Sequence, residues 1–435
     1  MLYYLIRPFV RIALRLFLRE IHFAHAENIP QGKAVILAAN HPTAFIEPCI
    51  MACFQGRSIF FLARGNLFGK RLYDFLLNQV HILPVYRLGD KGYAYVRHNY
   101  STFEACYEAL GKQKMLMILA EGTTIHEKRL RPLVKGTGRI ALGTMERNED
   151  LEDVYIVPVG VNYTHADQYQ SDLYINIGEP VSTRKIIQES DGNRNKGVLK
   201  LTQELRKKLL ERVIHINDPK DDEGVEVLLE MVRPNTHRPT FFSISKTDEQ
   251  FLKEKEIVDA INAMEKAEKA KLWENTQKYQ ALLDEQAIDE NVFKGKTGAA
   301  EKISLILLYP LFLISNILLF PPFFIGKYIA IHKVHYREFY SSVLLSVSLG
   351  AYVVYYGLLL GIGLLLGGYY WLWMALLVSL LTVFKLYYAR YWKDYRNNKR
   401  WRDCPPDVQD EILARRKVLL AFVGNKMKYT RQILS

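Results

Sequence analysis

The sequence feature that most constrains the fold is a long uncharged run near the carboxyl terminus. Residues 339–384 carry no charge and no histidine, a run of about 46 residues. A single helix of this length would measure about 70 Å, more than twice the hydrocarbon thickness of a bilayer, so the run predicts two membrane spans. The glycine clusters at 361–363 and 367–368 are candidates for the turn between them. Alternatively, Gly357 and Gly361 suit a close-packed helix interface.

A second uncharged run, residues 303–326, has about 24 residues and is also long enough to cross a bilayer. Pro310, Pro321 and Pro322 interrupt it, which favours a kinked or re-entrant hairpin. Lysines and arginines follow both runs, and the positive-inside rule places them on the cytoplasmic side. We therefore expect an integral membrane protein with a re-entrant element and a two-span hairpin, or alternatively three full spans. Its amino-terminal domain would lie on the cytoplasmic face, of the inner membrane if the source is bacterial.

Basic residues gather at both ends of a chain whose formal net charge is +12. Near the amino terminus, arginine recurs every four residues among apolar neighbours, at Arg7, Arg11, Arg15 and Arg19. This pattern predicts a basic helix that lies in the membrane interface and contacts anionic lipid. Packing of the same helix against a soluble domain is the alternative. No nucleic-acid-binding motif accompanies the charge, so we expect no nucleic-acid partner.

Apolar strand-like segments alternate with helix-like segments over the first half of the chain. Strands are expected at 34–39, 58–63, 80–85, 115–120, 154–162 and 173–177, and helices at 70–77, 99–110 and 137–147. This alternation predicts an α/β domain with a mostly parallel sheet flanked by helices. After about residue 196 the sequence turns helical, with an amphipathic stretch at 201–214 and a charged helix at 247–285. The expected organisation is a basic interfacial helix (1–24), the α/β domain (25–218), a helical connector (219–300), membrane-embedded helices (301–388) and a basic cytoplasmic tail (389–435).

The most informative motif is the stretch 38–48, which reads AANHPTAFIEP. It places His41 at the carboxyl end of a buried strand, and Pro42 where a helix can start. Glu47, on the first turns of that helix, could fold back toward the imidazole. A neutral imidazole held by a carboxylate is a general base near pH 7, whereas a histidine satisfied by backbone is the commoner alternative when the motif stands alone.

A second motif combines a glycine turn with a basic loop. Residues 119–124 read LAEGTT at a strand end, and residues 128–139 read KRLRPLVKGTGR. Gly122 allows a ligand to approach the backbone, the cations can neutralise a phosphate, and a helix that opens at Gly136 adds an anion-binding amino end. Arg87 also follows a strand. Active sites of parallel sheets gather at the carboxyl ends of their strands, which favours a site here.

The four cysteines indicate neither a disulfide framework nor a metal site. Cys49 and Cys53 are four residues apart and could share a metal, but no second pair completes a zinc set. We expect them to be core side chains, and we expect no metal.

In this order and spacing the motifs, together with a Val-Pro-Val strand at 157–159, resemble the glycerolipid acyltransferases, the lysophosphatidate and glycerol-3-phosphate acyltransferase superfamily. The resemblance covers about residues 20–180. The run 130–142, LRPLVKGTGRIAL, looks like the glycerol-3-phosphate acyltransferase subgroup of bacteria and fungi, in which a membrane-embedded part follows the catalytic domain. The resemblance implies that His41 is the catalytic base and Glu47 its partner. The candidate substrate-binding residues are Asn40, Arg64, Arg87, Glu121, Gly122, Thr123, Arg129, Arg131 and Lys135.

The resemblance also implies a reaction, in which an acyl group moves from acyl-CoA or acyl carrier protein to a hydroxyl of glycerol 3-phosphate or lysophosphatidic acid. The expected partners are this donor, this acceptor and the lipid membrane, and no cofactor is expected. Three departures from the family pattern stand out: Glu47 six residues after His41 instead of aspartate at five, Ala120 instead of proline, and Thr124-Ile125-His126 where arginine or Ser-His is common. The last leaves another lysophospholipid or a lyso-aminolipid open as acceptor. An idle lipid-binding protein is the remaining alternative, although the His41 and Glu47 pair argues against it.

Overall fold

The computed structural model describes residues 2–86, 99–238, 244–295 and 297–426. The chain forms two compact units, which are described separately. Unit 1 consists of Met1–Ile214, Phe242–Asp248 and Tyr336–Ser342. Unit 2 consists of His215–Phe241, Glu249–His335 and Val343–Ser435.

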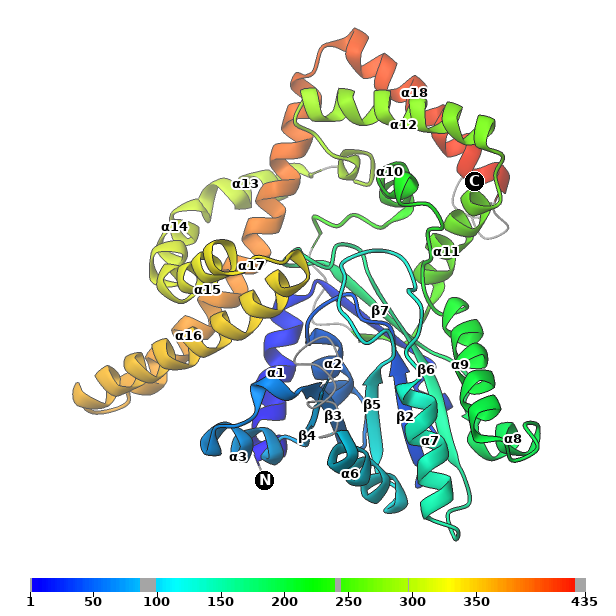
Figure 1. Ribbon diagram of the computed structural model, residues 1–435. Coiled ribbons are helices and arrows are strands. Elements are labelled where there is room, and N and C mark those ends of the chain that lie inside the picture. Colours follow the sequence, from blue (N-terminus) through cyan, green and yellow to red (C-terminus); the bar gives the residue numbers. More distant parts are fainter. Residues whose placement is uncertain (1, 87–98, 239–243, 296, 427–435) are drawn as a thin grey trace. The chain divides into compact units, whose positions relative to one another are not determined.

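Unit 1 is built on a mostly parallel sheet (Figure 1). Its strands are β1 (Glu20–Ala24), β2 (Ala34–Ala39), β3 (Ile59–Arg64), β4 (Ile82–Val85), β5 (Met115–Leu119), β6 (Val154–Tyr163), β7 (Asp172–Ile177), β8 (Val181–Ser182) and β9 (Ile244–Ser245). Their order is β4-β3-β5-β2-β6-β7-β1-β9, with β8 paired to β6. Neighbouring strands are parallel except where β7 and β8 pair antiparallel with β6. The α/β prediction and its six strands are confirmed.

Helices cover this sheet and bury its central strands. They are α1 (Leu2–Phe17), α2 (Ile46–Phe54), α3 (Arg71–Gln79), α6 (Asn99–Gly111), α7 (Gly136–Arg147), α8 (Thr183–Gln188) and α9 (Arg194–Leu210). One core contains Ile36, Leu116 and Ile156 from adjacent strands, packed with Ile140 of α7 and Leu205 of α9. Because β2 is buried along its whole length, both of its faces must be apolar, as its sequence AVILAA is.

The amino-terminal helix differs from the prediction in extent and in orientation. It ends at Phe17, and Glu20–Ala24 form strand β1, so the prediction of a helix through residue 24 is wrong. Arg7 donates to the carbonyl of Gln55, just beyond the carboxyl end of α2, and Arg11 lies over the ring of Phe54 at 5.3 Å. These two arginines contact α2 or the residue that follows it, although Arg11 is itself exposed, and the helix also exposes apolar residues, among them Leu5, Phe9 and Ile12.

Arg19 lies outside α1 and does not belong to an exposed basic ridge. Its side chain is buried and forms an ion pair with Asp172, with Nε at 2.6 Å from Oδ1. Breaking a buried pair by removing one partner typically costs about 3 to 5 kcal/mol. Arg19 therefore holds the start of β1 against β7, and the prediction that it contacts lipid is wrong.

Unit 2 is helical. Its helices are α10 (Asp222–Val232), α11 (Glu249–Asn262), α12 (Lys266–Glu285), α13 (Ala299–Leu307), α14 (Tyr309–Leu318), α15 (Phe320–Lys333), most of α16 (Arg337–Leu365), α17 (Tyr370–Asp403) and α18 (Pro406–Lys426). The predicted single charged helix at 247–285 is wrong, because the chain breaks between α11 and α12 and both helices pack against α10.

Two helices, α16 and α17, are long and apolar enough to cross a membrane. The bent pair α13 and α14, with an angle of 50°, is either a third, broken span or a re-entrant loop. The turn between α16 and α17 contains Gly367 and Gly368, the second of the two predicted glycine clusters. Both residues have positive φ, a conformation that favours glycine. Gly363 lies inside α16, where an added Cβ would come within 2.5 Å of the Cα of Trp371. Close packing therefore occurs there and not at Gly357 or Gly361, beside which the described residues leave open space.

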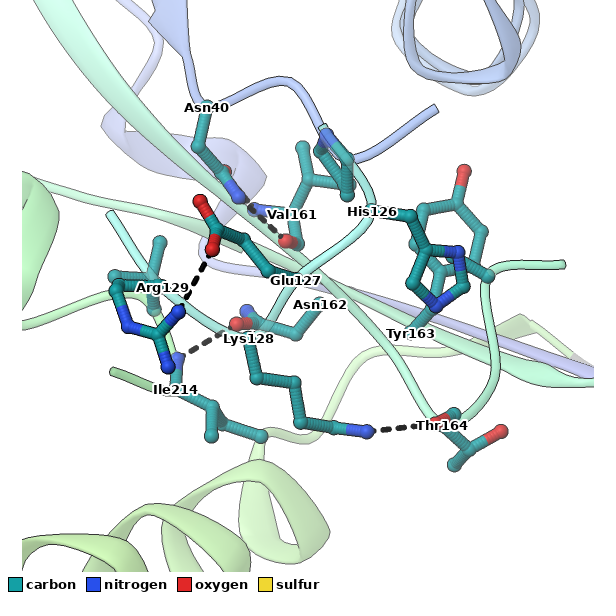
Figure 2. Close-up of a pocket in the computed structure, with 13 residues that line it drawn as sticks. Asn40, His126, Glu127, Lys128, Arg129, Val161, Asn162, Tyr163, Thr164 and Ile214 are labelled. Atoms are coloured by element: carbon teal, nitrogen blue, oxygen red, sulfur yellow. Dashed lines mark hydrogen bonds and ion pairs between the residues drawn. The ribbon is translucent and has the colours of Figure 1, made fainter. Parts of the chain in front are cut away.

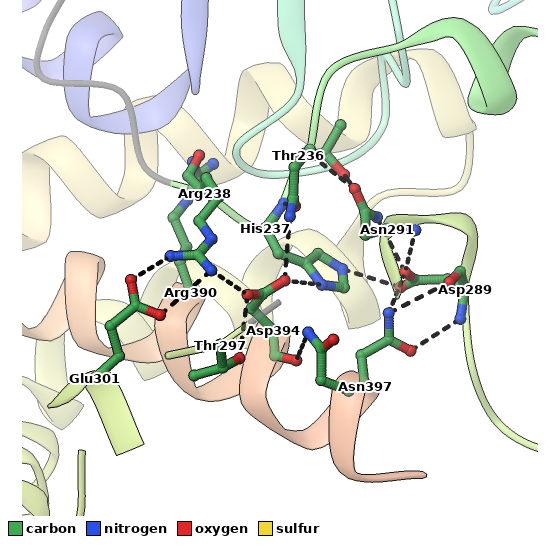
Figure 3. Close-up of polar contacts among 12 residues, drawn as sticks. Thr236, His237, Arg238, Asp289, Asn291, Thr297, Glu301, Arg390, Asp394 and Asn397 are labelled. Carbon is green, nitrogen blue, oxygen red and sulfur yellow. Dashed lines mark hydrogen bonds and ion pairs between the residues drawn. The ribbon is translucent and has the colours of Figure 1, made fainter. Parts of the chain in front are cut away.

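A buried polar cluster in unit 2 joins the connector to α17 (Figure 3). His237 Nε2 lies 2.9 Å from an oxygen of Asp289, and a guanidinium nitrogen of Arg238 lies 3.0 Å from Asp394 Oδ2. Asn397 donates to Asp289 Oδ1 at 2.9 Å. These ion pairs and hydrogen bonds link the charged end of α17 to the connector within unit 2.

Candidate active site

The amide of Asn40 determines where strand β2 ends. The last paired residue of β2, Ala39, lies opposite Val159 of β6. Beyond it, Asn40 Nδ2 donates to the carbonyl of Val161 at 2.8 Å, and the Val161 N–H donates to Asn40 Oδ1 at 2.7 Å. The side chain thus replaces one rung of the ladder, and the backbone leaves the sheet at His41. Asn40 was predicted to bind substrate, whereas here both ends of its amide bind β6.

His41 is buried and is held by two residues that follow β5. Its backbone N–H donates to Glu121 Oε2 at 2.8 Å. Its ring Nε2 lies 2.6 Å from the hydroxyl oxygen of Thr124. Adjacent parallel strands β2 and β5 bring these residues together at one edge of the sheet, as the sequence predicts for His41 and Glu121. Thr124 was not among the predicted site residues. Its departure from the family pattern was the sequence signal that could have pointed to it.

Glu47 is fully buried on the first turn of α2, which begins at Ile46 and not at Pro42. Its Oε1 accepts a hydrogen bond from the Thr43 N–H at 2.6 Å. Among the described residues, its Oε2 has no hydrogen-bond partner. Burial raises the pKa of Glu47 to about 8, and the charge of Glu121 adds to this effect. The hydrogen bond to Thr43 replaces the direct contact with the imidazole that the sequence suggested, so the role of Glu47 stays a prediction.

Glu121 is instead bonded on both oxygens. Oε1 accepts from the backbone N–H of Arg131 at 2.8 Å, and Oε2 accepts from its guanidinium at 2.8 Å. Arg131 also donates to the hydroxyl of Thr123 at 2.5 Å. Between them Gly122 has φ +73°, and an added Cβ would lie 2.9 Å from Val134, so glycine is required. Glu121, Gly122, Thr123 and Arg131 therefore form one rigid turn in which carboxylate and guanidinium neutralise each other.

The remaining predicted cations differ in their exposure and in whether they pair with a carboxylate. Arg129 pairs with Glu127 at 2.7 Å. Lys135 is exposed just before α7, and Arg64 is exposed at the end of β3, the strand next to β5. Arg87 lies outside the described residues. Lys135 and Arg64 are thus the more accessible cations of the described set.

A small cavity is lined in part by Asn40 and Pro42, the neighbours of His41 in sequence (Figure 2). Its volume is about 30 Å³, and its lining includes Asn40, Pro42, His126, Lys128 and Arg129. Lys128 Nζ donates to a carbonyl of the β6–β7 loop at 2.8 Å. A space of this size holds about one or two waters, so it is too small for an acyl chain or a glycerol phosphate.

His126 belongs to a second polar group at this cavity. Its Nε2 lies 3.9 Å from Asp167, which accepts a hydrogen bond from Arg337 Nε at 2.6 Å. Burial lowers the pKa of His126. Burial by itself raises the pKa of Asp167, but the hydrogen bond and charge of Arg337 together with the charge of His126 lower it further, and the net shift of the pKa is downward. Sequence reasoning missed this group, because Arg337 comes from the start of α16.

Three comparisons with known proteins bear on this site. Residues 20–162 match a family model described as "Acyltransferase". Glycerol-3-phosphate O-acyltransferase 1 of Saccharomyces cerevisiae is 31% identical over 83 residues, 19% of this chain and 11% of that protein. The crystal structure of the 1-acyl-sn-glycerophosphate acyltransferase PlsC from Thermotoga maritima matches with a TM-score of 0.33 and 17% identity, over 47% of this chain and 78% of that one. The chain thus spans about a tenth of the length of the yeast protein that it matches.

Proposed function

We propose that this chain, which belongs through residues 20–162 to the glycerolipid acyltransferase superfamily, moves a fatty acyl group from an acyl thioester to a hydroxyl of glycerol 3-phosphate or lysophosphatidic acid. The observation that carries the proposal is His41, buried at the end of β2 within the matched segment, with a hydroxyl already bonded to its Nε2. A hydroxyl oxygen at 2.6 Å is within reach for proton transfer.

The proposed reaction uses His41 as general base. The imidazole takes the proton of the acceptor hydroxyl while that oxygen attacks the thioester carbonyl carbon. The tetrahedral intermediate then collapses, the carbon–sulfur bond breaks, and the imidazolium returns the proton to the leaving thiolate. The substrate oxygen is itself the nucleophile, so no covalent enzyme intermediate and no cofactor is needed. Proton transfer of this kind contributes about 100- to 10,000-fold in rate.

Glu47 is proposed to favour the imidazolium that forms during attack. A carboxylate beside a catalytic histidine fixes its tautomer and stabilises its charged form. Oε2 of Glu47, which has no partner among the described residues, is the oxygen proposed to interact with the ring. A carboxyl group with a pKa of about 8 is largely protonated at pH 7, so this role couples catalysis to the ionisation of Glu47.

The acceptor phosphate is proposed to bind the accessible cations near the strand ends, Lys135 and Arg64, with Arg129 nearby on the loop after β5. The donor is proposed to be acyl-CoA or acyl carrier protein. A lysophospholipid or lyso-aminolipid acceptor is the alternative within the same chemistry.

Membrane association is proposed to involve the apolar side of α1 as well as α16 and α17. Leu5 and Phe9 of α1 are 61% and 58% exposed, and Leu72 and Phe75 of the contacting helix α3 are 65% and 59% exposed. A group of exposed large apolar side chains on two adjacent helices is typical of a surface that enters the lipid interface. The cytoplasmic location of unit 1 remains an expectation from charge placement.

The test is acyl transfer by purified protein in detergent, with acyl-CoA or acyl carrier protein and a panel of acceptors. The panel contains glycerol 3-phosphate, lysophosphatidic acid, lysophosphatidylcholine and a lyso-aminolipid. We expect transfer to the first or second acceptor, and a loss of about 100- to 10,000-fold in His41→Ala. His332→Ala, at an exposed histidine of α15, is the control. Wild-type rates in folded His41→Ala would overturn the mechanism and favour a lipid-binding protein.

A further inference from the structure

The loop between the two candidate catalytic residues is held from a distant part of the chain. Residues 40–45 connect β2 to α2, and buried backbone N–H groups in such loops require partners. Thr43 donates to Glu47 within the motif itself. The next two partners come from the start of α16: the Ala44 N–H donates to the Glu338 carbonyl at 3.2 Å, and the Phe45 N–H donates to the Ser342 hydroxyl at 3.3 Å.

These contacts occur at a weak point of the local sequence. Phe45 is the N-cap residue of α2, a position where serine, threonine, aspartate or asparagine normally satisfies a free amide. Phenylalanine has no group that can do so, and no side-chain cap is formed. The hydroxyl of Ser342, 297 residues away in sequence, accepts from the N–H of Phe45 itself, which a capping side chain at this position would not satisfy. The conformation that aims His41 and Glu47 is thus not fixed by its own segment.

The same turns of α16 hold a second loop of the site. Ser341 donates to the Ala166 carbonyl at 2.6 Å, and Arg337 donates to Asp167 at 2.6 Å. Ala166 lines the same small cavity as Asn40 and Pro42, and Asp167 faces His126, which lines it too. The loops on two sides of the candidate site therefore bind one short segment, and all of these residues belong to unit 1.

The composition of this segment is informative. Ser341 and Ser342 are 1% and 0% exposed, although they stand in a helix that carries no charge after Glu338. A serine in a spanning helix commonly bonds to a carbonyl of its own helix, as Ser346 does with Val343. Ser341 donates to a carbonyl of one site loop and Ser342 accepts from an amide of the other, so both hydroxyls contact the site.

We propose that residues 337–342, the first turns of α16, are a positioning element of the active site, with Ser342 as its main positioning residue. The element orients the loop that carries His41 and Glu47, so acyl transfer depends on a helix that also enters the membrane. This inference deepens the proposed function and rests on it for its kinetic readout.

The test compares Ser342→Ala with Ser346→Ala in the full-length protein, in phospholipid nanodiscs. Ser346 is an exposed serine four residues along the same helix, which makes it a matched control. Backbone hydrogen exchange is followed in peptides that cover residues 42–47, and acyl transfer is measured with the donor and acceptor identified above. For Ser342→Ala we expect exchange at Ala44 and Phe45 to rise about tenfold and kcat to fall about tenfold. KM for both substrates should stay within about twofold, because the variant changes loop orientation and not a binding contact.

The exchange measurement separates this inference from the proposed function. If exchange in residues 42–47 is the same in Ser342→Ala and Ser346→Ala, the positioning role is overturned whether or not the protein transfers acyl groups. A rise spread over all of unit 1 would also overturn it, because Ser342 would then be a general stabiliser. If the local rise occurs but wild-type protein acylates none of the acceptors, the positioning contact is supported and the proposed function fails.

Discussion

Two segments of the candidate site each bury a glutamate, and they differ in how the carboxyl group is bonded. In the segment 42–47, Glu47 accepts one hydrogen bond, from Thr43, and its pKa is raised to about 8 by burial. In the segment 121–131, Glu121 accepts from His41 and twice from Arg131, including a guanidinium at 2.8 Å. Among the described residues, the glutamate carboxyl group is therefore hydrogen-bonded at one oxygen in the segment 42–47 and at both oxygens in the segment 121–131.

The difference separates two uses of a buried carboxyl group. A carboxylate that is paired with arginine and bonded to backbone amides holds those groups in one geometry. A carboxyl group in a dry site with few donors loses less by keeping its proton, so its charge can change during a reaction. On this comparison Glu121 holds the backbone of His41 and the side chain of Arg131 in place, and Glu47 is the carboxyl group whose ionisation can change near pH 8.

Glu121→Ala is expected to have the largest effect, and the effect is on folding. The change removes the acceptor of the His41 N–H and the carboxylate partner that Arg131 has in Glu121, and removing one member of a buried ion pair typically costs about 3 to 5 kcal/mol. Thermal melting of detergent-solubilised protein measures this loss. Glu152→Ala, which removes an exposed partner of Lys33, should change stability by about 1 kcal/mol or less. Equal melting temperatures for the two variants would contradict the structural assignment of Glu121.

Glu47→Gln is expected to act on catalysis. The amide keeps the size of the side chain and its acceptor oxygen for Thr43, but it cannot carry the negative charge that stabilises an imidazolium. We expect kcat to fall by about 10- to 100-fold with KM nearly unchanged. Acyl transfer at matched folded concentration is the measurement. A fall confined to KM would instead place Glu47 in substrate binding.

The same variant tests the pKa of Glu47 through stability. Because the folded-state pKa is raised from an ordinary value of 4.5 to about 8, the folded protein keeps a proton that the unfolded chain releases. The stability from this group is fully present below about pH 4.5 and is lost as pH rises toward 8. Glutamine does not titrate, so the melting temperature of Glu47→Gln relative to wild type should increase from pH 5 to pH 8. The underlying slope is at most about 1.4 kcal/mol per pH unit. A constant difference would show that Glu47 has an ordinary pKa.

The sequence predicted the parts of the fold that local pattern controls. Strand β2 is recognisable because a strand buried on both faces must be apolar throughout. Strand β1 was missed because its sequence EIHFA contains a charge and a histidine, and its stability comes from pairing with β7 and β9. The break between α11 and α12 was missed because no glycine or proline marks it, and packing against α10 sets it.

In the site, too, contacts that follow from strand order could be predicted, whereas contacts made by distant residues could not. The meeting of His41 with Glu121 could be predicted, since parallel neighbours end at one edge of a sheet. The partner of Arg131 could not be predicted, because a cation in a basic loop suggests phosphate equally well. The direction of Glu47 depends on residues 42–45, whose amides are held by α16. A contact across almost 300 residues leaves no local signal.

Thr124 gives the smallest expected effect and sharpens the comparison, because it lies on the segment 121–131 yet touches the ring of His41. Its hydroxyl oxygen lies 2.6 Å from Nε2 of His41. A neutral hydrogen bond contributes about 1 kcal/mol, which corresponds to about a fivefold change in rate. We therefore expect Thr124→Val to lower kcat by about threefold to tenfold, and Thr124→Ser to keep most of the activity.

The control for Thr124 is Thr202→Val, which removes a hydroxyl bonded within α9 and away from His41. Acyl transfer under saturating substrate compares the three variants. A loss of more than about 100-fold in Thr124→Val would mean that this hydroxyl takes part in proton transfer, since general acid–base catalysis contributes at least that much. The 121–131 segment would then take part in proton transfer, and the distinction between a segment that only holds the site in place and a segment that changes its charge would be wrong. A loss within the expected range keeps Thr124 as a residue that aligns the imidazole and leaves the charge change to His41 and Glu47.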